Sequence, residues 1–317
     1  MDADRTHFAI KDFVHEHPIT VCDPCTRCKD CGTIVSYIDD NTYSVAKEDA
    51  QELSQVLTDN YEKISDYMMA NRLVINDKKT HLMVFCKKSL INERINVSFK
   101  AGEHVIVSSK TEKLLGARLD QSLRWNAHIV DNEMSLVKQL NSRVNGLSIV
   151  ARSASFKSRL MIANGIIIGK ICNLIQLWGG ASDFLIKSLQ KIQNKAGRVV
   201  TRKPWFTPTR LILKQCNWLA IKQLVQYHII LSTHKMLKSG KPRYFFEKFS
   251  SNHDHNTRTA VRFGENFSAK STLASNSFCY KGAVFYNKLP QEVTEAGSIQ
   301  VFKRRLKSWI QANVKLD

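Results

Sequence analysis

The fold is decided by the stretch Gly32-Thr-Ile-Val-Ser-Tyr-Ile-Asp-Asp-Asn41, which continues as Thr42-Tyr-Ser-Val-Ala46. Both parts are rich in β-branched and aromatic residues and flank Asp39-Asp40-Asn41, which favours a tight turn. The stretch predicts a β-hairpin with two adjacent carboxylates at its tip. At a turn both carboxylates can approach one cation, and Mg²⁺ binds one or two carboxylates together with substrate phosphates. A solvated Asp-Asp-Asn turn without function is the other interpretation.

Three motifs in order carry a resemblance to a known family. Tyr37-Ile-Asp-Asp40 resembles the Tyr-x-Asp-Asp hairpin of reverse transcriptases. Asn71-Arg-Leu-Val-Ile-Asn-Asp-Lys-Lys-Thr80, followed by a strand, resembles the next palm motif of the LINE-type (non-LTR retrotransposon) enzymes. Lys113-Leu-Leu-Gly-Ala-Arg-Leu-Asp120, followed by Leu123-Arg-Trp-Asn-Ala-His-Ile129, resembles their primer-grip strand and its run into the thumb. The resemblance extends from about Thr33 to the C-terminal end.

The resemblance implies an RNA-directed DNA polymerase, a nucleotidyltransferase whose partners are an RNA template and a DNA primer. Asp39 and Asp40 would hold Mg²⁺ or Mn²⁺ at the primer end, and Lys79 would assist the pyrophosphate leaving group. Contacts with the primer or with other parts of the nucleic acid are implied for Tyr37, Leu115 and Gly116.

The family also has fingers and an earlier palm strand with a further carboxylate. Asp12, in Ala9-Ile-Lys-Asp-Phe-Val14, vaguely resembles that strand, but it precedes Asp39 by only 27 residues. This spacing leaves no room for the intervening helix and strand, so we expect the motif to be absent. The chain would then be an incomplete polymerase fragment, inactive alone. The alternative is a catalytically dead nucleic-acid-binding protein derived from a retroelement.

Residues 1–31 form a leader in which half of the chain's eight cysteines occur at two-residue gaps, namely Cys22, Cys25, Cys28 and Cys31. Thiolates spaced C-x2-C suit a zinc knuckle, and Cys28 and Cys31 form the better pair because Gly32 relieves the turn. His15 or His17 can complete the ligand set. An iron–sulfur cluster and free thiols are the alternatives. Some LINE-type sequences carry a Cys-rich insertion at this place.

The bulk properties are those of a folded protein, with 43% hydrophobic and 24% charged residues in 317. No apolar run approaches the roughly 20 residues that span a bilayer. The N-terminus lacks the basic and apolar regions of a signal peptide. We expect an intracellular protein of the nucleus or cytoplasm that is not secreted and has no membrane partner.

Charge is distributed unevenly along the chain. Residues 1–126 carry 17 basic and 19 acidic side chains, a net charge of −2, whereas residues 127–317 carry 30 and 9, a net charge of +21. A strongly basic helical part favours contact with phosphate backbones over a charge that serves only solubility.

Periodicity predicts an α+β fold, a partial polymerase-palm sheet with one helix followed by a mainly helical thumb and C-terminal region. The expected divisions are the leader, a palm over 32–124, a basic helical thumb or connection over 125–240, and a C-terminal region over 241–317 with a polar loop and a basic helix. A helix is expected from Lys47 to Arg72, with later strands over 81–86, 95–101, 104–108 and 113–120. Longer helices are expected over 129–150, 156–178, 184–200 and 218–237.

One expected helix carries a row of cations at three- and four-residue spacing, a pitch that can follow phosphates: Lys187, Lys191, Lys195, Arg198, Arg202 and Lys203. Trp205 and Phe206 come directly after it and either stack on bases or cap the helix end. His228 and His234 are six residues apart, so we expect them to be core or surface residues and not metal ligands.

Overall fold

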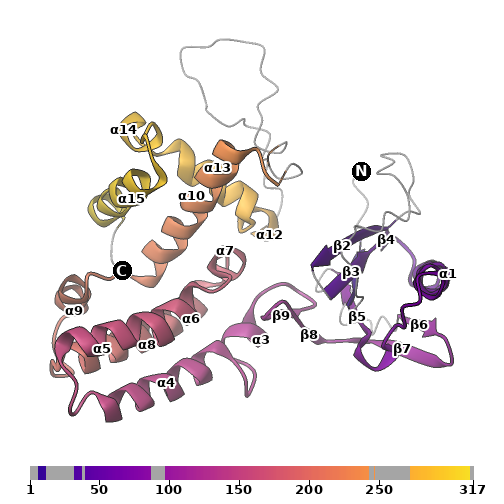
Figure 1. Cartoon of the computed structure of the whole chain (residues 1–317), viewed down its shortest axis with the longest axis horizontal. Helices are drawn as coiled ribbons and strands as arrows, with labels where there is room; N and C mark the ends of the chain where they lie inside the picture. Colours follow the sequence, from indigo (N-terminus) through magenta and orange to yellow (C-terminus); the bar gives the residue numbers. More distant parts are fainter. Residues whose placement is uncertain are drawn as a thin grey trace. The chain divides into compact units, whose positions relative to one another are not determined.

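The computed structural model describes residues 6–11, 32–37, 40–86, 97–242, 246 and 272–314. The chain divides into two compact units, Met1–His128 and Ile129–Asp317 (Figure 1). The first unit contains all strands of the described residues, and the second is built from helices. The expected α+β class is therefore confirmed. Among the described residues no helix is long and apolar enough to cross a membrane.

The first unit is organised around a sheet with the strand order β2-β3-β1-β5-β7-β6, in which β4 also pairs with β1. Strands β5 and β7 run parallel, and the other pairs are antiparallel. The strands are β1 (Thr6–Lys11), β2 (Thr33–Tyr37), β3 (Asp40–Ser44), β4 (Ala46–Lys47), β5 (His81–Phe85), β6 (Ser98–Ala101) and β7 (His104–Ser109).

Strand β1 corrects one expectation. The sequence predicted a sheet that begins at the hairpin, without an earlier strand, yet β1 lies between β3 and β5 in the sheet. Its local pattern is short and mixed, whereas in the fold it has a strand on each side. Pairing with residues more than 30 positions away thus specifies this strand more than its own propensity does.

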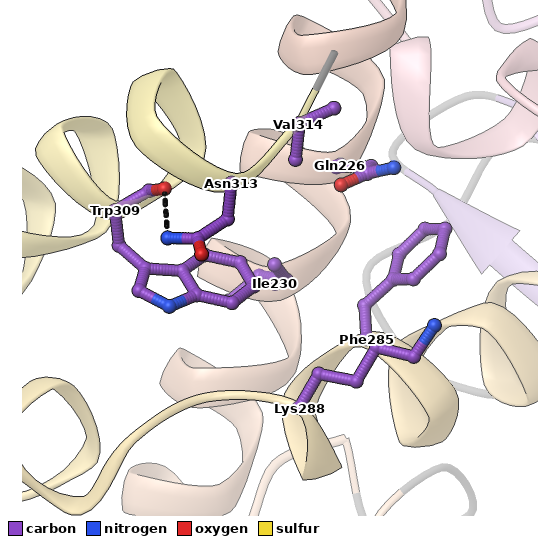
Figure 2. A pocket seen from close by; sticks show the side chains of 7 residues that line it. All are labelled: Gln226, Ile230, Phe285, Lys288, Trp309, Asn313 and Val314. Atoms are coloured by element: carbon purple, nitrogen blue, oxygen red, sulfur yellow. Dashed lines mark hydrogen bonds between the residues drawn. The ribbon is translucent and has the colours of Figure 1, made fainter.

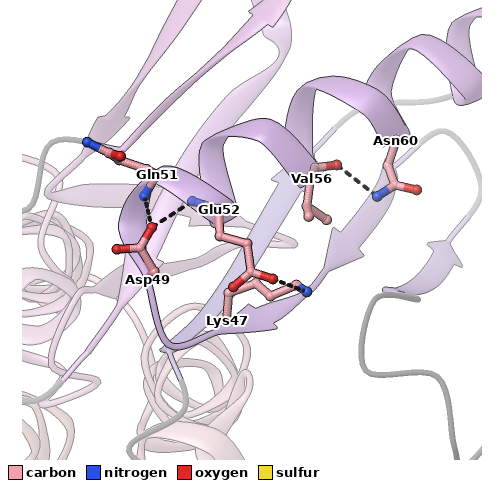
Figure 3. A network of polar contacts seen from close by, with 6 residues as sticks. All are labelled: Lys47, Asp49, Gln51, Glu52, Val56 and Asn60. Carbon is pink, nitrogen blue, oxygen red and sulfur yellow. Dashed lines mark hydrogen bonds and ion pairs between the residues drawn. The ribbon is translucent and has the colours of Figure 1, made fainter.

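Helix α1 (Ala50–Ala70) begins after Asp49, whose carboxylate accepts hydrogen bonds from the backbone N–H groups of Gln51 and Glu52 at 2.7 and 2.8 Å (Figure 3). An acidic N-cap satisfies N–H groups that have no partner within the helix and suits the positive end of its dipole. Lys47 of β4 forms an ion pair with Glu52 at 2.7 Å, which joins the strand to the first turn of the helix.

One face of α1 forms the core of this unit against the sheet. The 3.6-residue period predicted this face, and its buried apolar positions are Leu53, Leu57, Tyr61, Ile64 and Met68. They pack against strand residues that include Tyr43, Leu82 and Phe99. The rings of Tyr61 and Phe99 lie 5.4 Å apart. The α1 helix therefore fixes the sheet that includes the β2–β3 hairpin.

The segment 113–120 is a second correction, because the sequence predicted one strand there. It lies in a two-stranded ribbon of β8 (Thr111–Leu114) and β9 (Ala117–Asp120). Leu115 and Gly116 connect the two strands with φ angles of 46° and 89°. Positive φ at both central residues is what a tight type I′ hairpin turn requires, and glycine adopts it without strain.

The second unit consists of helices. Their bounds are α3 (Asn126–Ile129, at the junction of the units), α4 (Leu136–Val150), α5 (Phe156–Ala163), a π-helical turn η2 (Asn164–Ile168), α6 (Gly169–Cys172), α7 (Ile175–Trp178), α8 (Asp183–Thr201), α9 (Thr209–Cys216), α10 (Ile221–Ser239), α12 (Thr272–Ser275), α13 (Phe278–Asn287), α14 (Gln291–Thr294) and α15 (Ile299–Asn313). The expected helix over 156–178 is interrupted at Leu174, where φ is 54°.

Helix α8 packs against α4, α5 and α9, and α10 packs against α13 and α15 (Figure 1). The imidazole of His234 in α10 stacks on Phe302 of α15, with ring centroids 3.6 Å apart and planes 9° from parallel. Its Nδ1 atom also lies 2.8 Å from the hydroxyl oxygen of Tyr286 in α13. His234 is thus a core residue, which is one of the two positions that the sequence left open.

Candidate functional site

The β2–β3 hairpin is present and its connection is short. Tyr37 lies opposite Asp40, so the two residues between them, Ile38 and Asp39, connect the strands. Asp40 is therefore the first residue of β3 and not part of the connection. Asp39 lies outside the described residues. Whether the two carboxylates share a cation stays a prediction.

The strand register brings three features to one end of the strands, and two of them, the hairpin and the Lys79 turn, were predicted. Lys11, the last residue of β1, lies opposite Thr42 on one side and opposite His81 on the other. The same end of the sheet therefore holds the last residue of β1, the connection before Asp40 and the residues directly before β5. Lys79 precedes β5 by two positions. The resemblance implied a common site for the hairpin and Lys79, but the sequence did not predict that the end of β1 lies there as well.

The polypeptide just before β5 is held in place from α1. Residues Asp77–Lys79 form a short 3-10 turn, and the Tyr61 hydroxyl donates to Asp77 Oδ1 at 2.5 Å. Burial and the bond to Asp77 raise the pKa of Tyr61, so its proton stays in place. Lys79 is exposed in this turn. Its amine is available to an anion while its backbone is fixed.

Asn41, next to Asp40, is buried with 3% exposure, and its Nδ2 atom has no hydrogen-bond partner among the described residues. Buried amide groups are normally paired, so the Asn41 side chain has, within the described residues, an unused hydrogen-bond donor next to the hairpin carboxylates in the sequence. Asp12 follows β1 directly in the sequence and lies outside the described residues.

The β8–β9 ribbon presents Leu115 at its turn with 47% exposure. The ribbon is tied to the segment that follows, because the Arg118 N–H donates to His128 Nδ1 at 3.2 Å and Asp120 Oδ1 accepts from the N–H groups of Ser122 and Arg124 at 3.1 and 3.0 Å. Leu115 and Gly116 are accordingly a supported surface feature, and their contact with a primer stays a prediction.

The cation row of α8 separates into two groups. Lys187, Lys191 and, just beyond the end of α8, Lys203 are exposed and make no hydrogen bond or ion pair with other described residues. The rest are engaged within the unit. Lys195 reaches Asn145 Oδ1 at 3.1 Å, Arg198 donates to the Thr207 carbonyl at 3.4 Å, and Arg202 donates to the carbonyl oxygens of Ala151 and Arg152 at 2.7 and 2.9 Å. These three cations hold helix ends and loops together.

Negative charge is nearly absent from this part of the chain. Residues 134–246 contain 19 Lys and Arg residues and one acidic residue, Asp183. Asp183 lies at the start of α8, with Lys222 at 3.4 Å. This segment therefore has few carboxylates to neutralise the exposed lysines of α8, which favours a positive potential along the helix. A count of acidic residues along the sequence would have found this segment.

Trp205 and Phe206 follow the C-terminal end of α8 with 83% and 70% exposure. A helix cap would bury them against the last turn, so the capping interpretation is wrong. Their rings contact each other edge to face, with centroids 6.0 Å apart.

A cavity of about 380 Å³ lies where α10, α13 and α15 meet (Figure 2). Its lining includes the rings of Phe285 and Trp309 and the amides of Gln226 and Asn313, the last of which donates to the Trp309 carbonyl at 2.9 Å. The lining holds no carboxylate, histidine or cysteine, so we assign no chemistry to it.

The zinc prediction falls outside the described residues, because Cys22, Cys25, Cys28, Cys31 and both nearby histidines belong to residues 12–31. Within the described ranges no cluster of three or more His, Cys, Asp or Glu residues is placed to hold a metal ion. The metal predictions therefore stay predictions.

Comparison with known proteins supports the resemblance at a coarse level. The chain is 22% identical over 207 residues to the probable RNA-directed DNA polymerase from transposon X-element of Drosophila melanogaster. The matched region covers 64% of this chain and 22% of that protein, so the chain corresponds to about a fifth of its relative. No protein-family model matches the chain, and no solved structure matches it. The chain is thus distantly similar to a retrotransposon reverse transcriptase.

Proposed function

We propose that this chain is a portion of a non-LTR retrotransposon reverse transcriptase, consisting of part of the palm and the helical region after it, and that its helical unit binds nucleic acid. The observation that carries the proposal is the register at one end of the strands, where Lys11 lies between Thr42 and His81. That register supports a common site for the Tyr-Ile-Asp-Asp hairpin and the Lys79 turn. The similarity to the X-element polymerase supports the same family.

In this proposal Asp39 and Asp40 hold the divalent cation, since adjacent carboxylates on one hairpin are the oxygen donors that Mg²⁺ or Mn²⁺ prefers. The cation supplies charge neutralisation for the reacting phosphates when it is bound. Lys79 interacts with the pyrophosphate end of the nucleotide as an exposed cation. Tyr37, Leu115 and Gly116 contact the primer.

Strand β1 makes Asp12 the best candidate for the upstream palm carboxylate, because this residue follows the end of β1 in the sequence. The region matched to the X-element polymerase is only 22% of that protein's length. We therefore expect the chain alone to extend primers little or not at all. Primer extension on an RNA template with Mg²⁺ or Mn²⁺ tests this. Extension that is lost in Asp39→Asn and Asp40→Asn would overturn the expectation of an inactive fragment.

Nucleic-acid binding is tested with the full chain by fluorescence anisotropy on a labelled RNA–DNA duplex. Replacing Lys187 and Lys191 together by Glu should lower affinity roughly tenfold, because two phosphate contacts are lost and two repulsive charges are introduced. Lys63 and Lys100 are exposed in the first unit and provide a matched control with the same change of charge. Equal losses in the two double variants would contradict binding by α8.

A second function is favoured by the charge distribution alone, namely a retroelement-derived binding protein with no role in polymerisation. Its net charge of +21 after residue 126 suits non-specific binding whether or not the hairpin holds a metal ion. The two functions differ in one result. Supplying the remaining parts of a related polymerase in trans should support primer extension only in the first.

A further inference from the structure

The loop between α8 and α9 is rigidly connected although its aromatic side chains are exposed. Its residues Arg202–Pro208 contain two prolines, which restrict φ, and the Thr207 N–H donates to the Pro204 carbonyl at 3.1 Å. The Arg198 guanidinium also donates to the Thr207 carbonyl. Trp205 and Phe206 are thus presented to solvent on a backbone that is held from α8. Binding through these rings should lose little conformational entropy, because the loop backbone is already held by these hydrogen bonds.

Cationic residues flank the two rings in the sequence and in the neighbouring helix end. Lys203 precedes them and Arg210 follows in the first turn of α9, and both are exposed. Arg152 is also exposed. It lies at this end of the bundle, because its carbonyl oxygen accepts a hydrogen bond from the Arg202 guanidinium. The acidic residue of this segment, Asp183, lies at the opposite end of α8, about 27 Å away at the rise of an α-helix. The rings are therefore bordered by cations.

An exposed aromatic pair can dock on an apolar protein surface, on a lipid surface or on unpaired bases. Lys203 and Arg210 lie on either side of the pair in the sequence, and Arg152 lies at the neighbouring end of α4. These cations favour an anionic ligand that has planar groups between its charges. Backbone phosphates that alternate with bases meet this description. A duplex does not, because its bases are already stacked on one another and their faces are covered.

We propose that Trp205 and Phe206, bordered by Lys203, Arg210 and Arg152, form a binding site for a single-stranded nucleic-acid segment, in which an unpaired base stacks on Trp205. The inference rests on the proposed nucleic-acid binding and extends it from duplex contact along α8 to a separate single-strand site at its end. Stacking is independent of base identity, so the site should accept any sequence.

The test compares the full chain with single variants, using a labelled 20-nucleotide oligothymidylate and a 20-base-pair duplex. Trp205→Ala should weaken binding of the single strand roughly tenfold and leave binding of the duplex unchanged. The salt dependence should not change, because no phosphate contact is lost. Trp205→Phe should restore most of the affinity. Phe184→Ala is the matched control, since Phe184 is 71% exposed at the other end of α8.

Tryptophan fluorescence gives an independent readout. Of the five tryptophans, Trp178 and Trp218 are buried, with 0% and 7% exposure, Trp125 and Trp309 are partly exposed, and Trp205 is 83% exposed. Oligothymidylate should quench the wild-type emission, and most of the quenching should be lost in Trp205→Phe and retained in Phe184→Ala.

The outcomes separate the inference from the function on which it rests. A wild-type chain that binds neither nucleic acid overturns both. A wild-type chain that binds both ligands, with Trp205→Ala unchanged on the single strand, overturns the single-strand site alone. Binding to anionic phosphatidylserine vesicles that Trp205→Ala abolishes, without an effect on the oligonucleotide, would assign the rings to a lipid surface instead.

Discussion

The guanidinium of Arg202 donates to the carbonyl oxygen of Ala151 at 2.7 Å, although 51 residues separate the two in the sequence. Ala151 is the C-cap residue of α4, at the helix end where carbonyl groups have no partner within the helix. Arg202 itself has a φ of 55° at the end of α8. The pair therefore joins the C-terminal ends of two helices.

Arg202→Ala should lower the free energy of unfolding of the helical unit by about 1–3 kcal/mol, because carbonyl groups lose charged hydrogen-bond donors. Lys191→Ala, in the same cation row, should change it by less than about 0.5 kcal/mol, because Lys191 is exposed and makes no described contact. Hydrogen exchange of peptides from α4 and α8 measures both. Equal protection in the two variants would mean that Arg202 does not stabilise the bundle.

Two glycines in helices should respond to alanine with opposite signs. Gly146 in α4 has open space where an alanine methyl group would lie, with no atom beyond the backbone of its own helix within 4 Å. Gly146→Ala should therefore stabilise the unit by about 0.5–1 kcal/mol through helix propensity. A Cβ atom at Gly197 in α8 would lie 2.4 Å from Ile212 Cγ2 of α9. Gly197→Ala should accordingly destabilise the unit by about 1–3 kcal/mol through overpacking. Thermal unfolding compares the pair, and stabilisation by both would refute the close packing of α8 on α9.

His234 predicts a dependence of stability on pH. Burial, and secondarily the charge of Lys238, lowers its pKa to about 4 in the folded chain, against about 6.5 when unfolded. As the pH falls below 6.5 the unfolded chain takes up a proton that the folded chain does not. Stability is therefore complete above pH 6.5 and is lost between 6.5 and 4, by roughly 2 kcal/mol between pH 7 and pH 5.

The measurement is hydrogen exchange in α10 and α15 at pH 7 and pH 5, after correction for the intrinsic exchange rate. His234→Asn should remove most of the difference in protection between pH 7 and pH 5. A smaller part should remain, because burial also lowers the pKa of His228. His104→Asn, at an exposed position of β7, serves as the control. A pH dependence that His234→Asn leaves intact would assign it to another group.

Sequence periodicity was sufficient where one segment determines its own structure. The spacing of Leu53, Leu57 and Tyr61 predicted α1, and the turn residue Gly102 separated β6 from β7 as expected. It failed where distant partners decide. Strand β1 depends on its pairing with β3 and β5. The turn at Leu115 was not predicted, because the residues on both sides of it favour strands.

The candidate site divides in the same way. The sequence identified the cations of α8, but it could not distinguish Lys187 and Lys191 from Arg202, whose carbonyl partners come from another helix. It left the role of Trp205 open, because exposure depends on how α8 and α9 pack. The metal-binding roles of Asp39, Asp40 and the four leader cysteines stay predictions.

The central claim, that the helical unit is a phosphate-binding surface, is tested most directly by a salt series. The affinity of the full chain for a duplex should fall as salt rises, with a slope of log K against log salt of about −0.9 per phosphate contact. We predict a slope steeper than roughly −2, and one shallower by about 1 to 2 when Lys187 and Lys191 are replaced by Glu. No binding at low salt, or binding that salt leaves unchanged, would contradict the account.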